Sequence, residues 1–538
     1  MPLSTEAPFL IDQEGYAAGL PVHAVVRAEG PVALLDASGR VLRELNPETA
    51  LDEASGDRAA LLDLGLLPVG AYTLRCPAGE RGFTVSARPW RSAANALIKG
   101  LYFQRCGCAL CAKHAGPWTH GPCHTAPAVD WEDRTRTRLV PGGWHDAGDY
   151  GKYVTPGAVT AAHLIYARLL FPAGCSDPLS IPETGSGVPD ILSEARWELD
   201  WLLKMQREDG AFHHKLTKER FAPFIMPEDD RPTEFLMPVS HTATASACAD
   251  LALASRVWRA HDAAFAEHAL DAARKAWDWL RANPDFVPFR NPEGVRTGQY
   301  GDRSDADNRF WAACELYAAT GEAAFLRAAE EGLAAGQQLT HFGWADVAGL
   351  GALCCLFATE GEESAPLREA VREGFLRQTE GCLAAARASR FGTALPADRY
   401  VWGSVLSILS AAMAMAVGHR LTGRADLRDA ALDQLHYAFG MNALDTCFVT
   451  GLGERPVLHP HHRPSAADGI AAPVPGLISG GPNKCFPYPA TRERLGEDVP
   501  PARYFLDETP SADTNEIAIY WNSPAVFVAA CFDAMTAE

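Results

Sequence analysis

The stretch Val188–Gln206, "VPDILSEARWELDWLLKMQ", decides the fold class of this 538-residue chain. Its apolar residues recur at spacings of three and four and share one broad face: Ile191, Leu192, Ala195, Leu199, Leu202 and Leu203. This spacing predicts a helix that packs on a large core. Similar Ala-rich segments follow at 241–259, 263–281, 308–319, 322–337, 366–387, 401–421, 425–439 and 516–536. The sequence therefore predicts an all-α domain over residues 92–538.

Long connections separate these predicted helices, at 206–240, 283–307 and 440–514. They are polar or rich in proline and glycine. Because packing alone keeps connections short in an all-α domain, we expect these loops to carry function.

The chain before the helices has a different pattern, with short alternating runs such as "HAVVRA", "GAYTLRC" and "RGFTVSA". Ser38-Gly39 and Val69-Gly70 supply turn signals between the runs. This pattern predicts a small all-β sandwich over residues 1–88.

Composition limits the classes of partner. The formal net charge is −19, and no cluster of Lys and Arg is present, so we expect no nucleic acid and no anionic membrane surface as partner. The N-terminus lacks a basic start followed by an apolar run, and we find no uninterrupted apolar stretch of about 18 residues. These features predict a cytoplasmic protein. The sequence gives no indication of oligomeric state.

Two aspartates three residues apart stand in the glycine-rich segment "PGGWHDAGDYGKYV", Pro141–Val154. The spacing of Asp146 and Asp149 alone is compatible with helix capping, calcium binding or catalysis. A third carboxylate, Glu516, opens an apolar helix at the end of a long loop, where the helix dipole also favours an acidic residue.

Hydrogen-bond donors and aromatic rings accompany these carboxylates in the sequence. The loop "LHPHHRPSAADG" contains His461 and Arg463, and Trp402 and Tyr504 lie in other loops. Glycoside hydrolysis uses such a set: one acid protonates the leaving oxygen, a second carboxylate acts on water or sugar, and aromatic faces hold the sugar rings. The residue pattern favours a carbohydrate hydrolase without choosing a substrate.

Several cysteines and histidines cluster in "CGCALCAKHAGPWTHGPCHT", which begins at Cys106, and His145 follows. Structural zinc sites use four such ligands in a closed tetrahedron. The spacing therefore indicates a metal site.

Three long segments resemble, in the same order, signature segments of glycoside hydrolase family 9: "GGWHDAGDYGKYV", "VTGLGERPVLHPHHRPS" and "DTNEIAIYWNSP". The stretch "IDQEGY" is similar to the immunoglobulin-like module that precedes the catalytic domain in one subgroup. The resemblance implies an immunoglobulin-like sandwich followed by an (α/α)6 barrel. It also implies an inverting hydrolase that cleaves β-1,4-glucosidic bonds of cellulose-type glucans or cello-oligosaccharides.

The resemblance also assigns roles to individual residues. Asp149 aligns with the base that activates water, Asp146 with a neighbour that helps to hold this water, and Glu516 with the general acid. His461 and Arg463 match positions that contact sugar hydroxyls. Trp402 is similar to a stacking tryptophan, with a core position at a helix start as the alternative. His214 matches a further family position, for which a structural role is equally compatible.

Zinc at Cys106, Cys123, His124 and His145 is implied by the same subgroup. Four protein ligands would leave no open position, so we expect a structural zinc that clamps the loop beside Asp146. Cys108 and Cys111 are then extra; they could replace a ligand, pair as a disulfide or stay free.

A calcium ion could bind in the acidic loop "GQYGDRSDADNRF" through Asp302, Ser304, Asp305 and Asp307, although a solvated loop is an equal alternative. We expect no organic cofactor.

Two departures from the family pattern affect the expected cleft. Ala512 stands where many members have a tyrosine before the acid, and Val405 stands where an asparagine is common. They leave substrate preference open. One alternative is an exo-acting β-glucosidase or exo-β-glucosaminidase on short oligosaccharides. Others are a non-catalytic carbohydrate-binding or scaffold protein and a hydrolase in which zinc does the chemistry.

Overall fold

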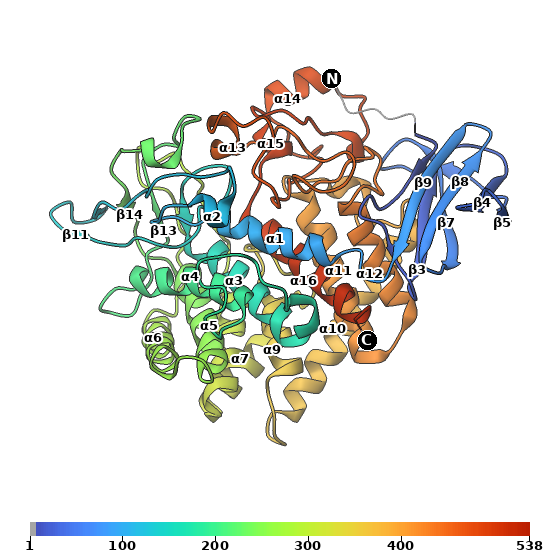
Figure 1. Cartoon of the computed structure of the whole chain (residues 1–538). Coiled ribbons are helices and arrows are strands. Elements are labelled where there is room, and N and C mark those ends of the chain that lie inside the picture. Colours follow the sequence, from blue (N-terminus) through green and yellow to red (C-terminus); the bar gives the residue numbers. More distant parts are fainter. Residues whose placement is uncertain (1–6, 538) are drawn as a thin grey trace.

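Alternating apolar residues near the N-terminus form two packed sheets in the computed structural model, which describes residues 7–537 (Figure 1). The strands are β1 (Phe9–Leu10), β2 (Tyr16–Ala17), β3 (Pro21–Val26), β4 (Val32–Asp36), β5 (Val41–Leu45), β6 (Ala50–Leu51), β7 (Arg58–Leu66), β8 (Gly70–Cys76) and β9 (Gly79–Ser86). One sheet has the order β1-β3-β7-β6 and the other β2-β9-β8-β4-β5. Inward residues such as Val22, Leu34 and Leu74 form the core between them. The predicted sandwich is confirmed.

The rest of the chain is mainly helical. The helices are α1 (Arg91–Phe103), α2 (Ala112–Ala115), α3 (Val154–Leu170), α4 (Asp190–Met205), α5 (His241–Trp258), α6 (Ala263–Ala282), α7 (Ala306–Thr320), α8 (Ala323–Ala334), α9 (Ala348–Phe357), α10 (Ala365–Ala388), α11 (Ser404–Thr422), α12 (Ala425–Ala438), α13 (Arg463–Ala467), α14 (Pro489–Leu495), α15 (Ala512–Asn515) and α16 (Ile519–Met535). Strand β9 ends at Ser86 and α1 begins at Arg91. The domain boundary expected between residues 88 and 92 stays a prediction.

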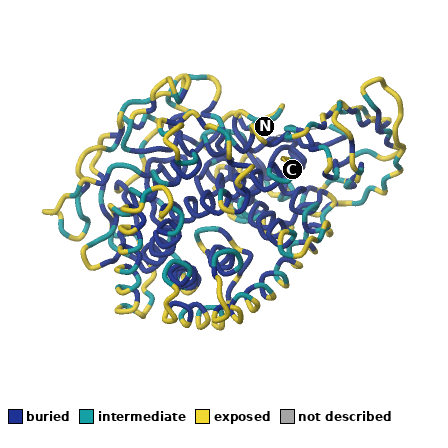
Figure 2. The backbone as a smooth tube through the Cα atoms, turned by 60° about the horizontal axis from the view of Figure 1, so that its bottom comes forward, coloured by how far each residue is buried: buried dark blue, intermediate teal, exposed yellow. Residues whose placement is uncertain are grey.

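Six helices form an inner ring of the predicted (α/α)6 barrel: α3, α5, α7, α9, α11 and α16. They are buried around most of their circumference, whereas α6, α8 and α10 bury one face against them. Figure 2 shows this arrangement as a buried centre with exposed positions along the rim. The difference follows from sequence, because the inner helices are apolar around most of their circumference, with a few buried charged residues such as Asp250 and Glu315, and the outer helices carry a charged face.

Helix α11 is long and apolar enough to cross a membrane by length and composition alone. About two thirds of its apolar window, 67%, is buried inside the fold, where α11 packs on α10, α12 and α16. The same composition is typical of a core helix, which accounts for its apolar sequence here.

Some elements differ from the predicted pattern. Helices α1 and α9 were not expected, and α11 begins at Ser404 rather than near residue 401. Gly403 has φ +76° and lies against the Trp521 ring, so the backbone turns there before the helix starts. A small five-stranded sheet was also not predicted; its strands are β10 (Ala128–Asp130), β11 (Thr137–Arg138), β12 (Lys152–Tyr153), β13 (Lys215–Thr217) and β14 (Phe235–Leu236).

The sandwich packs directly on the barrel. Leu10 and Val25 belong to the main apolar core of the helical part. Buried Asp12 accepts a hydrogen bond from the Trp90 indole at 3.0 Å and lies 2.7 Å from His436 Nδ1. These contacts fix the sandwich against α12, on the side of the barrel away from α6 (Figure 1).

Candidate active site

The loop that carries Asp146 and Asp149 lies between β11 and β12. Gly142 and Gly143 have φ of +104° and +73°, a region that favours glycine. Gly148 is required for another reason: a Cβ atom there would stand 1.9 Å from the carbonyl oxygen of His461. Only glycine lets the aspartate loop approach this second segment so closely.

Glu516 lies between α15 and α16, and main-chain hydrogen bonds hold its segment beside the aspartate loop. Ala147 and Ala518 form an antiparallel bridge, and the Ile519 N–H donates to the Asp146 carbonyl at 2.9 Å. On its other side, Glu516 forms a parallel bridge with His461. The structure thus places Glu516 beside Asp146 and Asp149, although some 370 residues separate Glu516 from Asp146 in the sequence.

These residues surround a cavity of about 500 Å³. Its lining is formed by Ala147, Asp149, Tyr153, Phe221, Gly298, Gln299, Tyr300, Trp344, Trp402, His461, Arg463, Tyr488, Pro510, Ala512, Glu516, Tyr520 and Trp521. Asp146 lies just behind this lining, where its Oδ2 accepts a hydrogen bond from the Tyr300 hydroxyl. Its Oδ1 is buried and has no hydrogen-bond partner among the described residues. A cavity of this size with aromatic walls and few charged groups is typical of a small-ligand site.

The surroundings of the carboxylates differ in charge. Burial raises the pKa of Glu516 well above its usual value, and the nearby charges of Asp149 and Asp146 raise it further. Burial also raises the pKa of Asp149, but the Arg463 guanidinium and the Gly151 N–H, which donates to Asp149 Oδ1 at 2.6 Å, oppose this rise. The site therefore favours a proton on Glu516 and a negative charge on Asp149.

His461 and Arg463 both line the cavity. His461 Nδ1 donates to the Thr509 carbonyl at 2.6 Å, and burial lowers the pKa of His461 to about 4, so the neutral ring leaves Nε2 as an acceptor. The Arg463 guanidinium donates to the Gly148 carbonyl at 2.6 Å and to the Ala222 carbonyl at 2.8 Å. Arg463 therefore ties the aspartate loop to the loop before β14.

Two residues expected at the cleft do not lie there. Tyr504 is fully buried in a small cluster with Leu495 and Leu506, because the chain turns away from Glu516 in this segment. His214 stacks on Phe289 with ring centroids 3.7 Å apart and bonds to Ser240 and to the Gln299 carbonyl. His214 is thus placed behind Gln299, where it supports the wall of the cavity.

Sequence reasoning missed several aromatic residues that line the cavity: Tyr300, Trp344, Tyr488, Tyr520 and Trp521. Tyr300 and Tyr488 belong to the long connections that we expected to carry function. Tyr520 and Trp521 stand in "EIAIYWNSP", directly after the acid, which was the one available local signal.

The four predicted metal ligands converge. The ligand atoms of Cys106, Cys123, His124 and His145 all lie within 4.8 Å of one another, and no other such group of three or more occurs within residues 7–537. Asp230 lies 3.2 Å from His124 Nε2, on the side away from the other ligands, and pairs with Lys218. A Cys₂His₂ set with a carboxylate behind one histidine fits zinc.

The two extra cysteines and the acidic loop at 298–310 form no such group of metal ligands among the described residues. Cys108 is partly exposed and Cys111 is exposed, and both are free thiols. In the acidic loop, the Asp305 carboxylate pairs with Arg309, and Asp307 accepts a hydrogen bond from the Val347 N–H at 2.8 Å. These partners occupy two of the predicted calcium ligands, and calcium stays a prediction.

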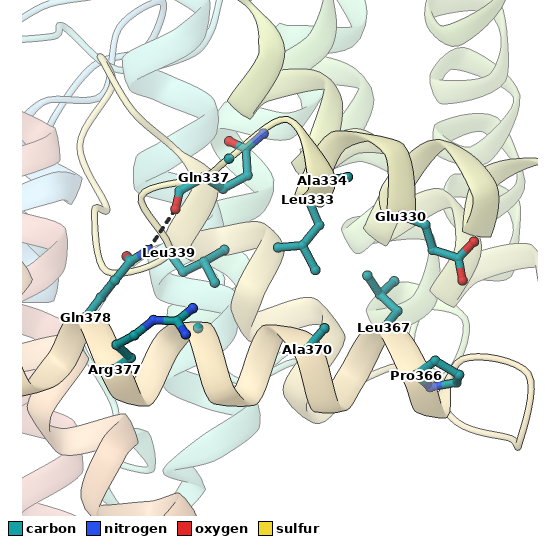
Figure 3. Close-up of a pocket in the computed structure, with 12 residues that line it drawn as sticks. Glu330, Leu333, Ala334, Gln337, Leu339, Pro366, Leu367, Ala370, Arg377 and Gln378 are labelled. Carbon is teal, nitrogen blue, oxygen red and sulfur yellow. Dashed lines mark hydrogen bonds between the residues drawn. The ribbon is translucent and has the colours of Figure 1, made fainter.

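A second cavity, of about 570 Å³, lies between α8 and α10 (Figure 3). Leu333, Leu339 and Leu367 line it, and the Gln378 amide donates to the Gln337 carbonyl at 2.8 Å across one end. Glu330 is the only carboxylate among its lining residues, so it lacks the pair that hydrolysis requires.

Comparisons of this chain with known protein families, sequences and structures agree with the geometry of the site. The family model of glycosyl hydrolase family 9 matches residues 90–529. A cellodextrinase of Butyrivibrio fibrisolvens is 36% identical over 96% of this chain and 98% of its own length. The solved structure of AaCel9A in complex with cellobiose-like isofagomine has a TM-score of 0.91 and 36% identity, covering 98% of this chain and 100% of that one. A Zn-binding triple mutant of a family 9 endoglucanase has a TM-score of 0.90 and 32% identity, with coverage of 96% and 99%.

Proposed function

Since this chain belongs to glycosyl hydrolase family 9, we propose that it cleaves β-1,4-glucosidic bonds of cello-oligosaccharides with inversion, using Asp149 as base and Glu516 as acid. The observation that carries the proposal is the convergence of Asp146, Asp149 and Glu516 on one aromatic cavity.

The steps follow from the charge asymmetry of the site. Glu516, whose pKa is raised, donates a proton to the leaving glycosidic oxygen. Asp149 takes a proton from a water molecule, which attacks the anomeric carbon from the opposite face. Asp146, whose Oδ2 is fixed by Tyr300 just behind the cavity lining, helps to hold this water. His461, Arg463 and Trp402 position the sugar rings, with Trp402 supplying an aromatic face.

We further propose that Cys106, Cys123, His124 and His145 hold a structural zinc ion. Their donor set and proximity support it. Zinc there would fix the loop that carries Asp146, because the proposed ligand His145 is the residue directly before Asp146. The chemistry assigned to Asp149 and Glu516 does not require the metal.

Product analysis tests the function. Hydrolysis of cellohexaose, followed by chromatography and by NMR of the newly formed anomer, should give shorter cello-oligosaccharides with the α-anomer first. Release of glucose alone from one end would favour the exo-acting alternative, and cleavage of glucosamine oligomers but not cellohexaose would overturn the substrate assignment. The β-anomer as first product would overturn inversion.

A further inference from the structure

Two aromatic rings from separate segments form a corner of the cavity. Trp402 comes from the turn before α11, and Tyr488 directly precedes α14. Their ring centroids are 5.3 Å apart and their planes are nearly perpendicular, at 89°. Trp402 is 36% and Tyr488 is 43% exposed, so both rings offer surface to a ligand in the cavity that Glu516 lines.

The backbone around Tyr488 is fixed before any ligand binds. Pro487 and Pro489 flank it, and its φ of −63° and ψ of 151° are the extended values that a following proline favours. The Tyr488 N–H donates to Asp513 Oδ2 at 2.7 Å, and Asp513 Oδ1 accepts from Thr491 at 2.8 Å. Because Asp513 lies three residues before Glu516, the same short segment positions the acid and the tyrosine.

The chain leaves space for this ring. Ala512 also lines the cavity, and its methyl group occupies little of it. The resemblance to the family implies a tyrosine at this position in many members. Tyr488 brings an aromatic ring to the same wall from a different loop.

The hydroxyl of Tyr488 is available to a substrate. Within the part of the chain that the structure describes, no group bonds to it. Partial burial raises the pKa of Tyr488 to about 12, so the hydroxyl keeps its proton at neutral pH and can donate to a sugar oxygen.

We propose that Tyr488 is a substrate-binding residue that forms, together with Trp402, a binding subsite for one glucose ring beside Glu516. The apolar face of the ring stacks on one aromatic side chain while its edge contacts the other. The proposal rests on the proposed function, since it names a subsite for the same substrate.

The test measures binding without turnover. In a Glu516→Gln background, the affinity for cellotetraose is measured by calorimetry with and without Tyr488→Ala, Tyr488→Phe or Phe486→Ala. Phe486 is the matched control, because it lies two residues away in the same loop, is 68% exposed and does not line the cavity. Since Tyr488 is partly exposed, all variants should fold, and their melting temperatures check this.

We expect Tyr488→Ala to weaken binding about tenfold, Tyr488→Phe by less than about threefold and Phe486→Ala by less than about twofold. An unchanged affinity for Tyr488→Ala, or an equal loss for Phe486→Ala, would overturn the subsite. A loss for Tyr488→Phe as large as for Tyr488→Ala would overturn stacking as its basis. Failure of the wild-type enzyme to cleave cellohexaose would instead overturn the proposed function, so the two failures are distinguishable.

Discussion

The two halves of the site are held in different ways. Side chains hold the aspartate loop: the Glu198 carboxylate accepts from the Trp144 N–H at 2.8 Å, Lys204 donates to the Pro141 carbonyl at 2.9 Å, and Lys152 donates to the Gly142 carbonyl at 2.9 Å. The Cys/His group, to which His145 of this loop belongs, contacts the aspartate loop on another side. Backbone bridges hold the Glu516 segment, between Ala518 and Ala147 and between Glu516 and His461. Side chains add to them, since Asn515 donates to the His459 carbonyl at 2.7 Å.

This difference has a consequence for mutation. A side-chain substitution cannot remove a backbone bridge, whereas the contacts that Glu198, Lys204 and Lys152 make to the aspartate loop each depend on one residue type. The geometry of the acid should therefore tolerate nearby substitutions, and the geometry of the base should depend on residues outside the cavity. The following predictions test this contrast.

The largest effect is expected for the reacting groups themselves. Asp149→Asn and Glu516→Gln should each lower kcat on cellohexaose by roughly 10²–10⁴-fold, because each removes a proton-transfer group. Tyr504→Phe is the control; it lies outside the cavity and should leave kcat unchanged. A Glu516→Gln enzyme of normal activity would exclude Glu516 as the acid.

Gly148→Ala tests the contact between the two halves. The added methyl would collide with the His461 carbonyl, so we expect the loops to separate and kcat to fall by about a hundredfold. Gly381→Ala is the matched control, because this helical glycine has nothing near its Cβ position and alanine favours a helix. Equal activity in both variants would contradict the required close approach.

Loss of the proposed zinc should act on stability first. Cys123→Ser, or prolonged chelation, should remove one equivalent of zinc measured by elemental analysis and lower the melting temperature by about 5 °C. Activity well below the new melting temperature should fall much less than in Glu516→Gln. Complete loss of activity in a folded, zinc-free enzyme would instead favour catalytic zinc.

The smallest effect concerns Glu198. Burial raises the pKa of its carboxyl to about 8 in the folded protein, from an ordinary value of 4.5. Between these values the folded state binds a proton that the unfolded state does not, so this group destabilises the fold increasingly as pH rises from about 4.5 to 8. Glu198→Gln removes the titration while its amide oxygen can still accept from Trp144. Its melting temperature relative to wild type should therefore rise between pH 5 and pH 8; a constant difference would contradict the raised pKa.

The sequence predicted those helices and strands whose apolar pattern lies within one short segment of the chain. The Leu and Ala pattern of Val188–Gln206 corresponds to α4, and the alternating runs near the N-terminus form the two sheets. The three carboxylates stand in long motifs, so their roles could be expected before their positions were known. The Cys/His spacing indicated a metal site, and the resemblance to the family implied its four ligands.

Other features depend on tertiary contacts that no local pattern contains. Tyr300 reaches Asp146 from a loop 154 residues away in sequence, and Tyr488 reaches the cavity because Asp513 binds its backbone. Tyr504 was expected at the cleft because it is near Glu516 in sequence. The intervening chain turns it into a separate apolar cluster, which only the folded structure reveals.

The position of Glu516 just before α16 also bears on how the protein is made. Helix α16 packs on α1 and α3, and it is synthesised after both of them. Until it docks, the nascent chain exposes the apolar sides of those two helices and has a base without an acid. Hydrolytic activity should therefore appear only after α16 has been synthesised, and a chain cut shortly before α16 would be both inactive and prone to aggregate.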